Sequence, residues 1–299
     1  MRSLSNIFTV DVEDWYHICD TEDQISSSQW GECESRVKKN IEKILQALLK
    51  KKVRGTFFIL GYIAEHYPEV VKMIDGEGHE LASHGYSHLQ VYKQKPEDFR
   101  SELQRSRDVI ESISGKEIYG YRAPEWSIGR ITSRDGKKMS FWALEVLAQS
   151  GFHYDSSIAP VKIIGTQDAP AFPYTIRTQY GDIGEFPPLV MSTFMGNIPV
   201  GGGWGLRVMS YLDIKNTIKR FNQQGVPALI YIHPWETDDN LPRLRLPLAK
   251  RFACYGRLKK TWTTFLKLID DFEFTTIHTV LTDNRSRQLP IYDACTLQG

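Results

Sequence analysis

Cysteine is scarce in this chain. The 299 residues include four cysteines, and no two of them form a Cys-x-x-Cys pair. So few thiols cannot provide a disulfide framework for a chain of this length. We therefore expect all four to be reduced. They are Cys19, Cys33, Cys254 and Cys295.

An excess of one charge sign is also absent. The chain has 37 lysine and arginine residues against 36 aspartate and glutamate residues, which is a formal net charge of +1. No run of five or more like charges occurs along it. This balance argues against a basic nucleic-acid-binding protein and against an acidic tail. We expect no nucleic-acid partner.

The chain has no long apolar run. Its longest apolar stretches, around residues 55–64 and 226–232, are far shorter than the ~18 to 20 residues that a membrane-spanning helix needs. Near the N-terminus, Asp11, Glu13 and Asp14 come before the apolar core of an export signal could be completed. We expect a soluble, cytoplasmic protein without a transmembrane segment.

The chain does contain strand-like and helix-like segments in alternation. Short apolar runs rich in β-branched and aromatic residues indicate strands, and apolar residues spaced three or four apart indicate amphipathic helices. Such alternation predicts a parallel α/β sheet or barrel. The predicted strands are 6–12, 55–60, 79–83, 118–121 and 227–232, and the predicted helices include 34–52, 96–114, 141–150 and 211–224.

The segment from about residue 160 to 205 departs from this alternation. It contains six prolines and a run of three glycines at 201–203. Proline and glycine favour turns and irregular backbone. This composition predicts long loops or an irregular β insertion.

Polar side chains follow four of the predicted strands at the point where each strand ends. Parallel α/β barrels place their active sites at the carboxyl ends of their strands. We therefore expect these four groups to contribute to one site. They are residues 11–14, 84–88, 122–126 and 233–235.

The first two groups contain candidate metal ligands. His84 and His88 are four residues apart, so one helical turn or a tight loop directs both imidazoles at one ion. A carboxylate from the first strand would complete three protein ligands and leave positions open, which is typical of a catalytic metal. Strand alternation places Asp11 and Glu13 on one face, as a base and a ligand, but Asp14 competes with Glu13 for the ligand role. The simpler alternative is a chance pair of histidines, with Asp14 as a cap.

Arg122 and His233 each permit two interpretations. Arg122 ends an apolar strand, where a structural ion pair with an inward carboxylate is at least as well supported as a surface cation. His233 also ends an apolar strand, where a satisfied core histidine is as common as a functional one. His17, Cys19 and Cys33 lie close to the acidic group, and their spacing makes no nucleophilic pair, so we assign them to packing or to the pocket wall.

Taken in this order, the motifs resemble the polysaccharide deacetylase superfamily, carbohydrate esterase family 4, over roughly residues 5–237. The matching segments are 9–14 for the strand-end aspartate motif, 83–88 for the metal-binding His-x-x-x-His, 122–124 for Arg-x-Pro and 229–234 for Leu-x-x-His-Pro. A closer resemblance is to the exosortase-associated deacetylases of exopolysaccharide loci. It rests on residues 11–15, 154–157 and 199–203 and on a C-terminal extension that resembles residues 242–281.

The resemblance implies a fold and an activity. The fold is a distorted (β/α)7 barrel of the TIM-like type over residues 1–240, with residues 241–299 as a C-terminal extension packed on the barrel. The activity is metal-dependent removal of acetyl groups, N-acetyl foremost, from a sugar or polysaccharide in cell-surface polysaccharide biosynthesis. The implied cofactor is a divalent metal, zinc foremost. The implied partner is the acetylated sugar or polysaccharide, and no oligomeric state is implied.

The resemblance also assigns roles to individual residues. Asp11 is the general base, Arg122 orients it and His233 is the general acid. Asp155 is a candidate for the carboxylate that tunes His233. The implied metal ligands are His84 and His88 with either Glu13 or Asp14.

Apolar and aromatic residues near the motifs are candidates for substrate binding. Trp126 and Leu229, with Ile230, form the expected slot for the acetyl methyl group. A backbone N–H near Tyr86 or Tyr121 is expected to hold the oxyanion. Core packing is the alternative for each aromatic side chain. The candidates for stacking on sugar faces are Trp15, Tyr16, Trp204 and Trp235.

Two other function classes are compatible with the motifs. One is an allantoinase-like or cyclic-imidase-like amidohydrolase of the same fold. The other is a binding protein without turnover in a polysaccharide-assembly complex. The retained Asp11 and the aromatic-rich rim favour a sugar substrate, and the intact set of catalytic positions favours an enzyme.

Overall fold

The computed structural model describes residues 4–18, 21, 24–133, 136–162, 165–283 and 289–294. Cys19 and Cys295, which we expect to be reduced, lie outside the described residues. Cys33 and Cys254 are free thiols, as predicted.

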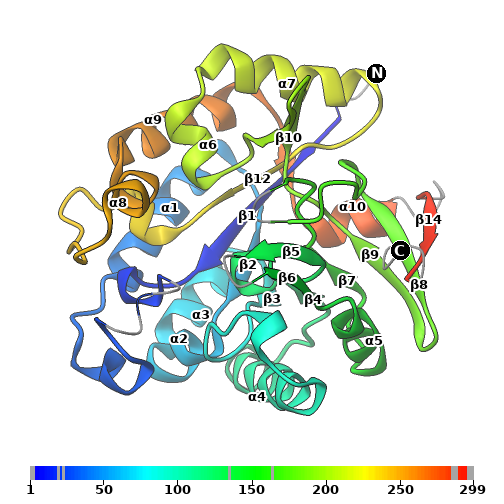
Figure 1. The fold of residues 1–299 in the computed structure, drawn as a ribbon. Helices are drawn as coiled ribbons and strands as arrows, with labels where there is room; N and C mark the ends of the chain where they lie inside the picture. Colours follow the sequence, from blue (N-terminus) through cyan, green and yellow to red (C-terminus); the bar gives the residue numbers. More distant parts are fainter. Residues whose placement is uncertain are drawn as a thin grey trace.

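A mainly parallel sheet forms the centre of the molecule (Figure 1). Within the described residues it has ten strands, and only β8 and β9 pair antiparallel. In order across the sheet the strands are β12 (Leu229–Ile232), β1 (Asn6–Val12), β2 (Thr56–Ile59), β3 (Glu80–Ser83), β4 (Gly120–Tyr121), β7 (Tyr154–Asp155), β9 (Gly181–Glu185), β8 (Tyr174–Thr178) and β14 (Ile291–Asp293), with β13 (Phe274–Thr275) paired to β1.

Strand β1 lies between β12 and β2. In its register Phe8 stands opposite Ile230 on one side, and Val10 stands opposite Phe57 on the other. All of β1 is buried. A parallel strand covered on both faces is expected to be apolar along its whole length, which explains its continuous apolar pattern.

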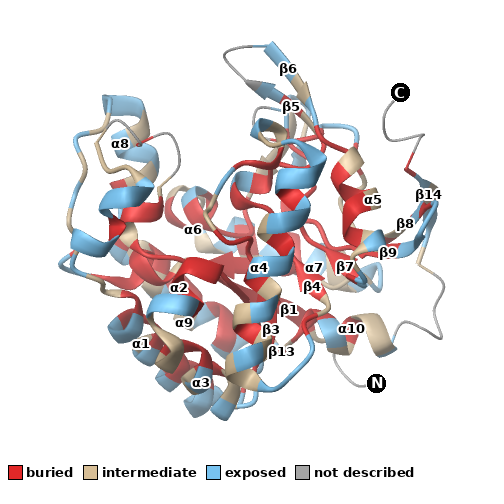
Figure 2. Cartoon of the chain, turned by 90° about the horizontal axis from the view of Figure 1, so that it is seen from below, coloured by how far each residue is buried: buried red, intermediate tan, exposed pale blue. Residues whose placement is uncertain are grey.

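Helices surround the sheet. Figure 1 shows α1 to α5 in turn around its outside, and Figure 2 shows their buried faces turned inward and their exposed faces turned to solvent. In α1, for example, Ile41, Ile44 and Leu48 are buried, as the apolar spacing predicts. The helices are α1 (Val37–Lys51), α2 (Gly61–His66), α3 (Pro68–Gly76), α4 (Pro96–Ser114), α5 (Trp142–Gln149), α6 (Gly203–Val208), α7 (Tyr211–Gln223), α8 (Leu248–Tyr255), α9 (Leu258–Asp271) and α10 (Ile277–Asp283).

The proline-rich segment from 160 to 205 is a β insertion. It contains the hairpin β8–β9 and a second hairpin of β10 (Val190–Thr193) and β11 (Gly196–Pro199), and a third hairpin, β5 (Arg130–Ser133) with β6 (Gly136–Met139), precedes it. The N–H of Leu189 donates to the carbonyl of Leu229 at 3.0 Å, and the N–H of Tyr231 donates to the carbonyl of Gly201 at 2.9 Å. The insertion therefore lies along the side of β12 that faces away from β1.

The C-terminal part of the chain shares the core of the sheet. Phe8 of β1 stacks on Phe265 of α9 with ring centroids 4.9 Å apart. Helix α9 also packs against α1 and α6. The division at residue 240 into a barrel and an extension stays a prediction. Within the described ranges, every helix is too short or too polar to cross a membrane.

Candidate metal centre and active site

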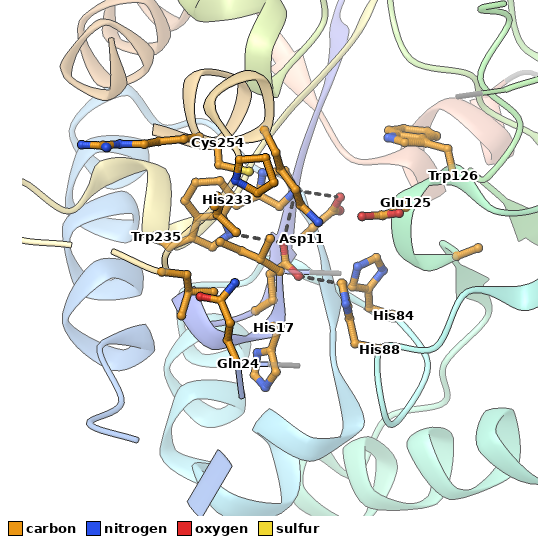
Figure 3. A pocket seen from close by; sticks show the side chains of 18 of the residues that line it. Asp11, His17, Gln24, His84, His88, Glu125, Trp126, His233, Trp235 and Cys254 are labelled. Carbon is orange, nitrogen blue, oxygen red and sulfur yellow. Dashed lines mark hydrogen bonds and ion pairs between the residues drawn. The ribbon is translucent and has the colours of Figure 1, made fainter. Parts of the chain in front are cut away.

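The polar groups at the strand ends meet in one cavity of about 1630 Å³. Asp11 and Glu13 come from the end of β1, His84 and His88 from the chain after β3, and His233 from the end of β12. Figure 3 shows Asp11, His84, His88 and His233 gathered at one place. Because β12, β1, β2 and β3 are adjacent parallel strands, their carboxyl ends open at the same edge of the sheet.

Glu13, His84 and His88 form a candidate metal site. One ligand atom of each lies within 4.8 Å of those of the other two. The Nδ1 atom of His84 lies 2.8 Å from the carbonyl oxygen of Arg122, so Nδ1 carries the proton and Nε2 keeps its lone pair. The buried Oε2 of Glu13 accepts no hydrogen bond from the described residues, although it lies 2.7 Å from His88 Nε2. Two imidazoles and one carboxylate are a donor set that fits zinc or a similar divalent ion.

Two of the three candidate ligands, Glu13 and His84, have the protonation states that metal binding needs. Burial alone raises the pKa of Glu13, but positive charge on His88 and His233 outweighs it and holds that pKa well below its usual range. Burial lowers the pKa of His84 to about 4, because its protonated form is poorly solvated there. An ionised carboxylate and a neutral imidazole are the forms that bind a metal.

Asp14 lies in a different environment from Glu13. Its carboxylate accepts hydrogen bonds from the Ser35 hydroxyl at 2.8 Å and from the N–H groups of Arg36 and Val37 at 2.8 and 3.1 Å. These groups belong to the start of α1, whose first N–H groups have no partner within the helix. Of the two candidates for the third ligand, Glu13 lies with the two histidines, and the Asp14 carboxylate caps the start of α1.

Asp11 is held by Arg122. The guanidinium Nη1 lies 2.6 Å from Asp11 Oδ1 and also donates to the hydroxyl of Thr9 at 2.8 Å. Arg122 is fully buried, and its guanidinium lies 4.1 Å from the ring of Phe58 and 4.7 Å from that of Trp126. The pairing leaves Oδ2 of Asp11 directed at the cavity side, 3.9 Å from His233.

His233 lies across the cavity from the histidine pair (Figure 3). Its Nε2 is 3.3 Å from Glu13 Oε1, and its Nδ1 is 3.0 Å from Oε2 of Glu236. Burial alone lowers the pKa of His233, but the surrounding carboxylates of Glu13, Glu236 and Asp11 raise it to about 9.

Glu236 and Arg207 are site residues that the sequence did not reveal. Nη2 of Arg207, which comes from α6, lies 3.6 Å from Oε1 of Glu236, and both side chains are buried. An acid three residues after His233 is a signal that could have pointed to Glu236. Asp155, the candidate drawn from the resemblance, instead accepts a hydrogen bond from Ser157. Burial raises the pKa of Asp155 above its usual range.

The four predicted substrate contacts divide into two groups. Trp126 and Trp235 line the cavity, on opposite sides in Figure 3. Trp235 stacks on His233 with centroids 5.2 Å apart. Tyr86 donates its hydroxyl to Glu65, and Leu229 is buried in the core. Neither Tyr86 nor Leu229 is among the described residues that line the cavity.

Comparison with known protein families gives two matches along the chain. Residues 29–143 match the polysaccharide deacetylase family model, and residues 156–282 match a domain of unknown function, DUF3473. The polysaccharide deacetylase model covers less than half of the chain, so the match shows similarity to that family over this segment. The polysaccharide deacetylase match contains His84, His88 and Arg122, whereas Asp11 precedes it and His233 falls within the second match.

Curated relatives share part of this chain. This chain is 32% identical over 118 residues to a peptidoglycan deacetylase from Helicobacter pylori. The matched segment covers 40% of this chain and 36% of that protein. The chain is 36% identical over 118 residues to a peptidoglycan-N-acetylglucosamine deacetylase from Bacillus cereus, which covers 38% of this chain and 43% of that protein. The chain thus spans less than half the length of these relatives.

Solved structures confirm the predicted fold class. A crystal structure from Mycobacterium smegmatis, provisionally named as a polysaccharide deacetylase, matches with a TM-score of 0.62 at 20% identity, covering 96% of this chain and 93% of that one. Puue allantoinase matches with a TM-score of 0.59 at 14% identity, covering 94% and 90%. The fold is therefore α/β of the polysaccharide deacetylase type, although the described strands form an open sheet.

Proposed function

We propose that this chain is a metal-dependent deacetylase that removes acetyl groups, N-acetyl foremost, from a sugar or polysaccharide. The observation that carries the proposal is the convergence of three side chains that can bind a metal, Glu13, His84 and His88, beside the Asp11–Arg122 pair and His233. The peptidoglycan deacetylases among its relatives act on substrates of the same kind.

The metal site would supply an electrophile. Glu13, His84 and His88 would hold a divalent ion, which when bound would polarise the acetyl carbonyl and lower the pKa of a bound water towards ~7. Zinc is the ion we propose, because the donor set is two imidazoles and one carboxylate.

Asp11 is the proposed general base. Arg122 occupies Oδ1, which leaves Oδ2 to accept the proton of the attacking water. The buried guanidinium fixes the orientation of the Asp11 carboxylate. Asp11 is thus separated in role from Glu13, two residues further along the same strand end.

His233 is the proposed general acid. Its Nε2 faces the metal-binding side of the cavity and delivers a proton to the departing amine nitrogen of the sugar. The Glu236 carboxylate accepts hydrogen bonds from Nδ1 and from the backbone N–H of His233. These two bonds fix the orientation of the ring. Arg207 lies 3.6 Å from Glu236 and forms an ion pair with this carboxylate.

We also propose that the reaction belongs to cell-surface polysaccharide biosynthesis and takes place in the cytoplasm. The sequence motifs predict that the protein belongs to an exosortase-associated exopolysaccharide locus. Residues 1–240 would form the catalytic barrel, and residues 241–299 the extension packed on it. Trp126 and Trp235 would contact the sugar, because both line the cavity.

The test combines metal analysis with two assays on the same preparation. Zinc-loaded protein is expected to bind about one ion per chain and to release acetate from N-acetylated oligosaccharides. Hydrolysis of allantoin or a cyclic imide without acetate release would replace this proposal by an amidohydrolase of the same fold. Glycan binding without release of acetate or ureide product would support a binding protein instead.

A further inference from the structure

One wall of the cavity is formed by the chain from residue 243 through α8. Residues 243–247 and several residues of α8 line the same cavity as Asp11 and His233. Figure 3 shows Cys254 of α8 on one side of the catalytic group and Trp126 on the other. Figure 2 shows α8 and the β5–β6 hairpin standing apart at one end of the molecule, and both contribute residues to the cavity lining.

This wall carries cations without acidic partners. Arg243, Arg245 and Arg251 are exposed and line the cavity, and none of them has an ion pair with a described carboxylate. Lys138 of β6 lines the cavity as well and is likewise unpaired within the described ranges. By contrast Arg36, close by, pairs with Asp238.

The carboxylates of the same cavity are already engaged. Asp11 is paired with Arg122, and Glu13 lies against His88 and His233. Glu125 accepts a hydrogen bond of 2.6 Å from the side chain of Gln90. Asp11 and Glu13 are balanced by neighbouring basic groups, so they do not cancel the positive charge that the unpaired arginines bring to the outer cavity.

The arginine-bearing wall is held in place by its backbone. The N–H of Arg245 donates to the Gln24 side chain at 2.8 Å, and the Gln24 amide donates back to the Arg245 carbonyl at 2.9 Å. The N–H of Leu244 donates to the Tyr255 hydroxyl at 3.0 Å. Arg207 donates to the carbonyls of Cys254 and Ala253, each at 2.6 Å, so α8 is tied to the residue that supports Glu236.

The size of the cavity leaves room beyond the reacting sugar. Its volume of about 1630 Å³ exceeds the range of about 300 to 1000 Å³ that is usual for small-molecule sites. A single acetylated sugar would not reach from the metal site to every wall. Groups on neighbouring units of a longer substrate would therefore meet the arginines.

We propose that the acetylated substrate of this site is anionic, and that Arg243, Arg245 and Arg251 bind phosphate or carboxylate groups on units next to the sugar that loses its acetyl group. The guanidinium fork matches both groups in shape and charge. The inference rests on the proposed deacetylase function and adds the charge class of its substrate. A concave wall shared with the catalytic residues favours a substrate over a membrane surface as the anion.

The test compares matched substrates. For wild-type protein loaded with zinc, kcat/KM is expected to be at least about tenfold higher for an N-acetylated oligosaccharide with uronate or phosphate groups than for its neutral counterpart. A tenfold change corresponds to about 1.4 kcal/mol, which is close to what one hydrogen bond to a charged group contributes. The preference should shrink as salt is raised. The uronate and phosphate arms distinguish the two sources of charge.

Variants locate the effect. The triple variant R243Q/R245Q/R251Q is expected to lose the preference through a higher KM for the anionic substrate, with kcat/KM for the neutral substrate unchanged. The control K39Q/K72Q/R220Q removes the same charge from exposed residues that do not line the cavity, and it should keep the preference. Calorimetric binding of the anionic oligosaccharide to both variants provides a second measurement that does not need turnover.

Two outcomes would overturn the inference. One is equal kcat/KM for neutral and anionic substrates, and the other is a preference that survives in R243Q/R245Q/R251Q. If in the second case the variant also loses binding to vesicles with anionic lipid, the arginines would be assigned to a membrane. If no substrate releases acetate, the proposed function fails, and the calorimetric arm still decides whether the arginines bind anionic glycans.

Discussion

Single buried charges determine what the candidate site can do. Arg122 has no exposed surface, and its charge is balanced by Asp11 at 2.6 Å. Removing one partner of a buried pair leaves the other charge without compensation, which costs more than the pair contributes. Substitutions that keep the hydrogen-bond geometry are therefore the informative ones at this scale.

Asp11→Asn separates the base from the metal site. The amide oxygen can still accept a hydrogen bond from Arg122, so the fold and the metal content should stay near wild type. Turnover of an N-acetylated oligosaccharide should fall ~10²-fold or more, because the general base is lost. Steady-state kinetics with metal analysis measures both. Full activity in this variant would contradict the role of Asp11.

His79 provides a pH dependence that lies outside the candidate site. Burial, together with the nearby charge of Arg54, lowers its pKa from 6.5 to about 4, and Nδ1 accepts a hydrogen bond from the N–H of Gly55 at 3.2 Å. Between these pH values the unfolded chain binds the proton and the folded chain does not. The contribution of neutral His79 to the free energy of unfolding is therefore complete above pH 6.5, and it is lost as the pH falls towards 4.

His79→Asn should flatten this dependence. The asparagine oxygen can replace Nδ1 as acceptor for Gly55 but does not titrate. The wild-type free energy of unfolding should fall relative to that of the variant by up to about 3 kcal/mol between pH 7 and pH 4. Urea unfolding at a series of pH values measures the difference. A constant difference across this range would show that His79 titrates normally in the folded protein.

At the scale of elements, the end of β12 connects the candidate site to other parts of the second half of the chain. The turn at Pro234–Thr237 places Glu236 against both the backbone and the ring of His233. On the side away from β1, β12 is hydrogen-bonded to the backbone of Leu189 and Gly201 in the 160–205 insertion. The position of His233 therefore depends on contacts from two segments that are distant along the chain.

Glu236→Gln tests the support of His233. The amide still accepts the backbone hydrogen bond but no longer balances a positive imidazole. We expect kcat to fall about tenfold or more, as for other residues that orient a reacting group, with KM and zinc content close to wild type. Arg207→Gln should change kcat in the same direction. An unchanged kcat in Glu236→Gln would mean that His233 needs no such support.

Gly202→Ala tests the contact between the insertion and β12. A Cβ atom at this position would lie 2.4 Å from the ring of Tyr231 and 2.5 Å from its carbonyl oxygen. Since backbone must move, we expect a loss of about 1 to 3 kcal/mol in the free energy of unfolding and a lower kcat. Gly76→Ala is the matched control, because no atom lies within 4 Å of its added Cβ. Equal thermal stability of the two variants would argue against this contact.

At the scale of the whole molecule, the candidate metal site joins segments that fold around one centre. Glu13 directly follows β1, and His84 and His88 follow β3. A ligand that binds only the folded chain stabilises it by mass action, by about 2.7 kcal/mol at a hundredfold excess over Kd. Metal loading should therefore be visible in stability as well as in activity.

Zinc should raise the melting temperature of metal-free protein by several degrees, and a chelator should reverse the change. His84→Ala should abolish both the shift and acetate release, because one of two imidazole ligands is removed. Differential scanning calorimetry with and without zinc checks this. A zinc-dependent shift that persists in His84→Ala would place the ion elsewhere.

Local patterns predicted the elements of this fold well. The apolar run of β1 and the apolar stripe of α1 depend on near neighbours and on burial, both of which are written in short stretches of sequence. The strand-end positions of Asp11, His84 and His233 likewise follow from the rule that parallel strands open their carboxyl ends to one edge. The sequence by itself therefore determined the fold class and the edge of the sheet at which the candidate site residues lie.

Tertiary structure decided which side chains meet at that edge. Which of Glu13 and Asp14 lies beside the histidine pair depends on the start of α1. Its backbone N–H groups donate to the Asp14 carboxylate from more than twenty residues away. The contact of Arg207 with Glu236 and the arginine wall of the cavity depend on contacts just as remote. The physical reason is that hydrogen bonds and charge pairing act between neighbours in space, and only the packed chain establishes those neighbours.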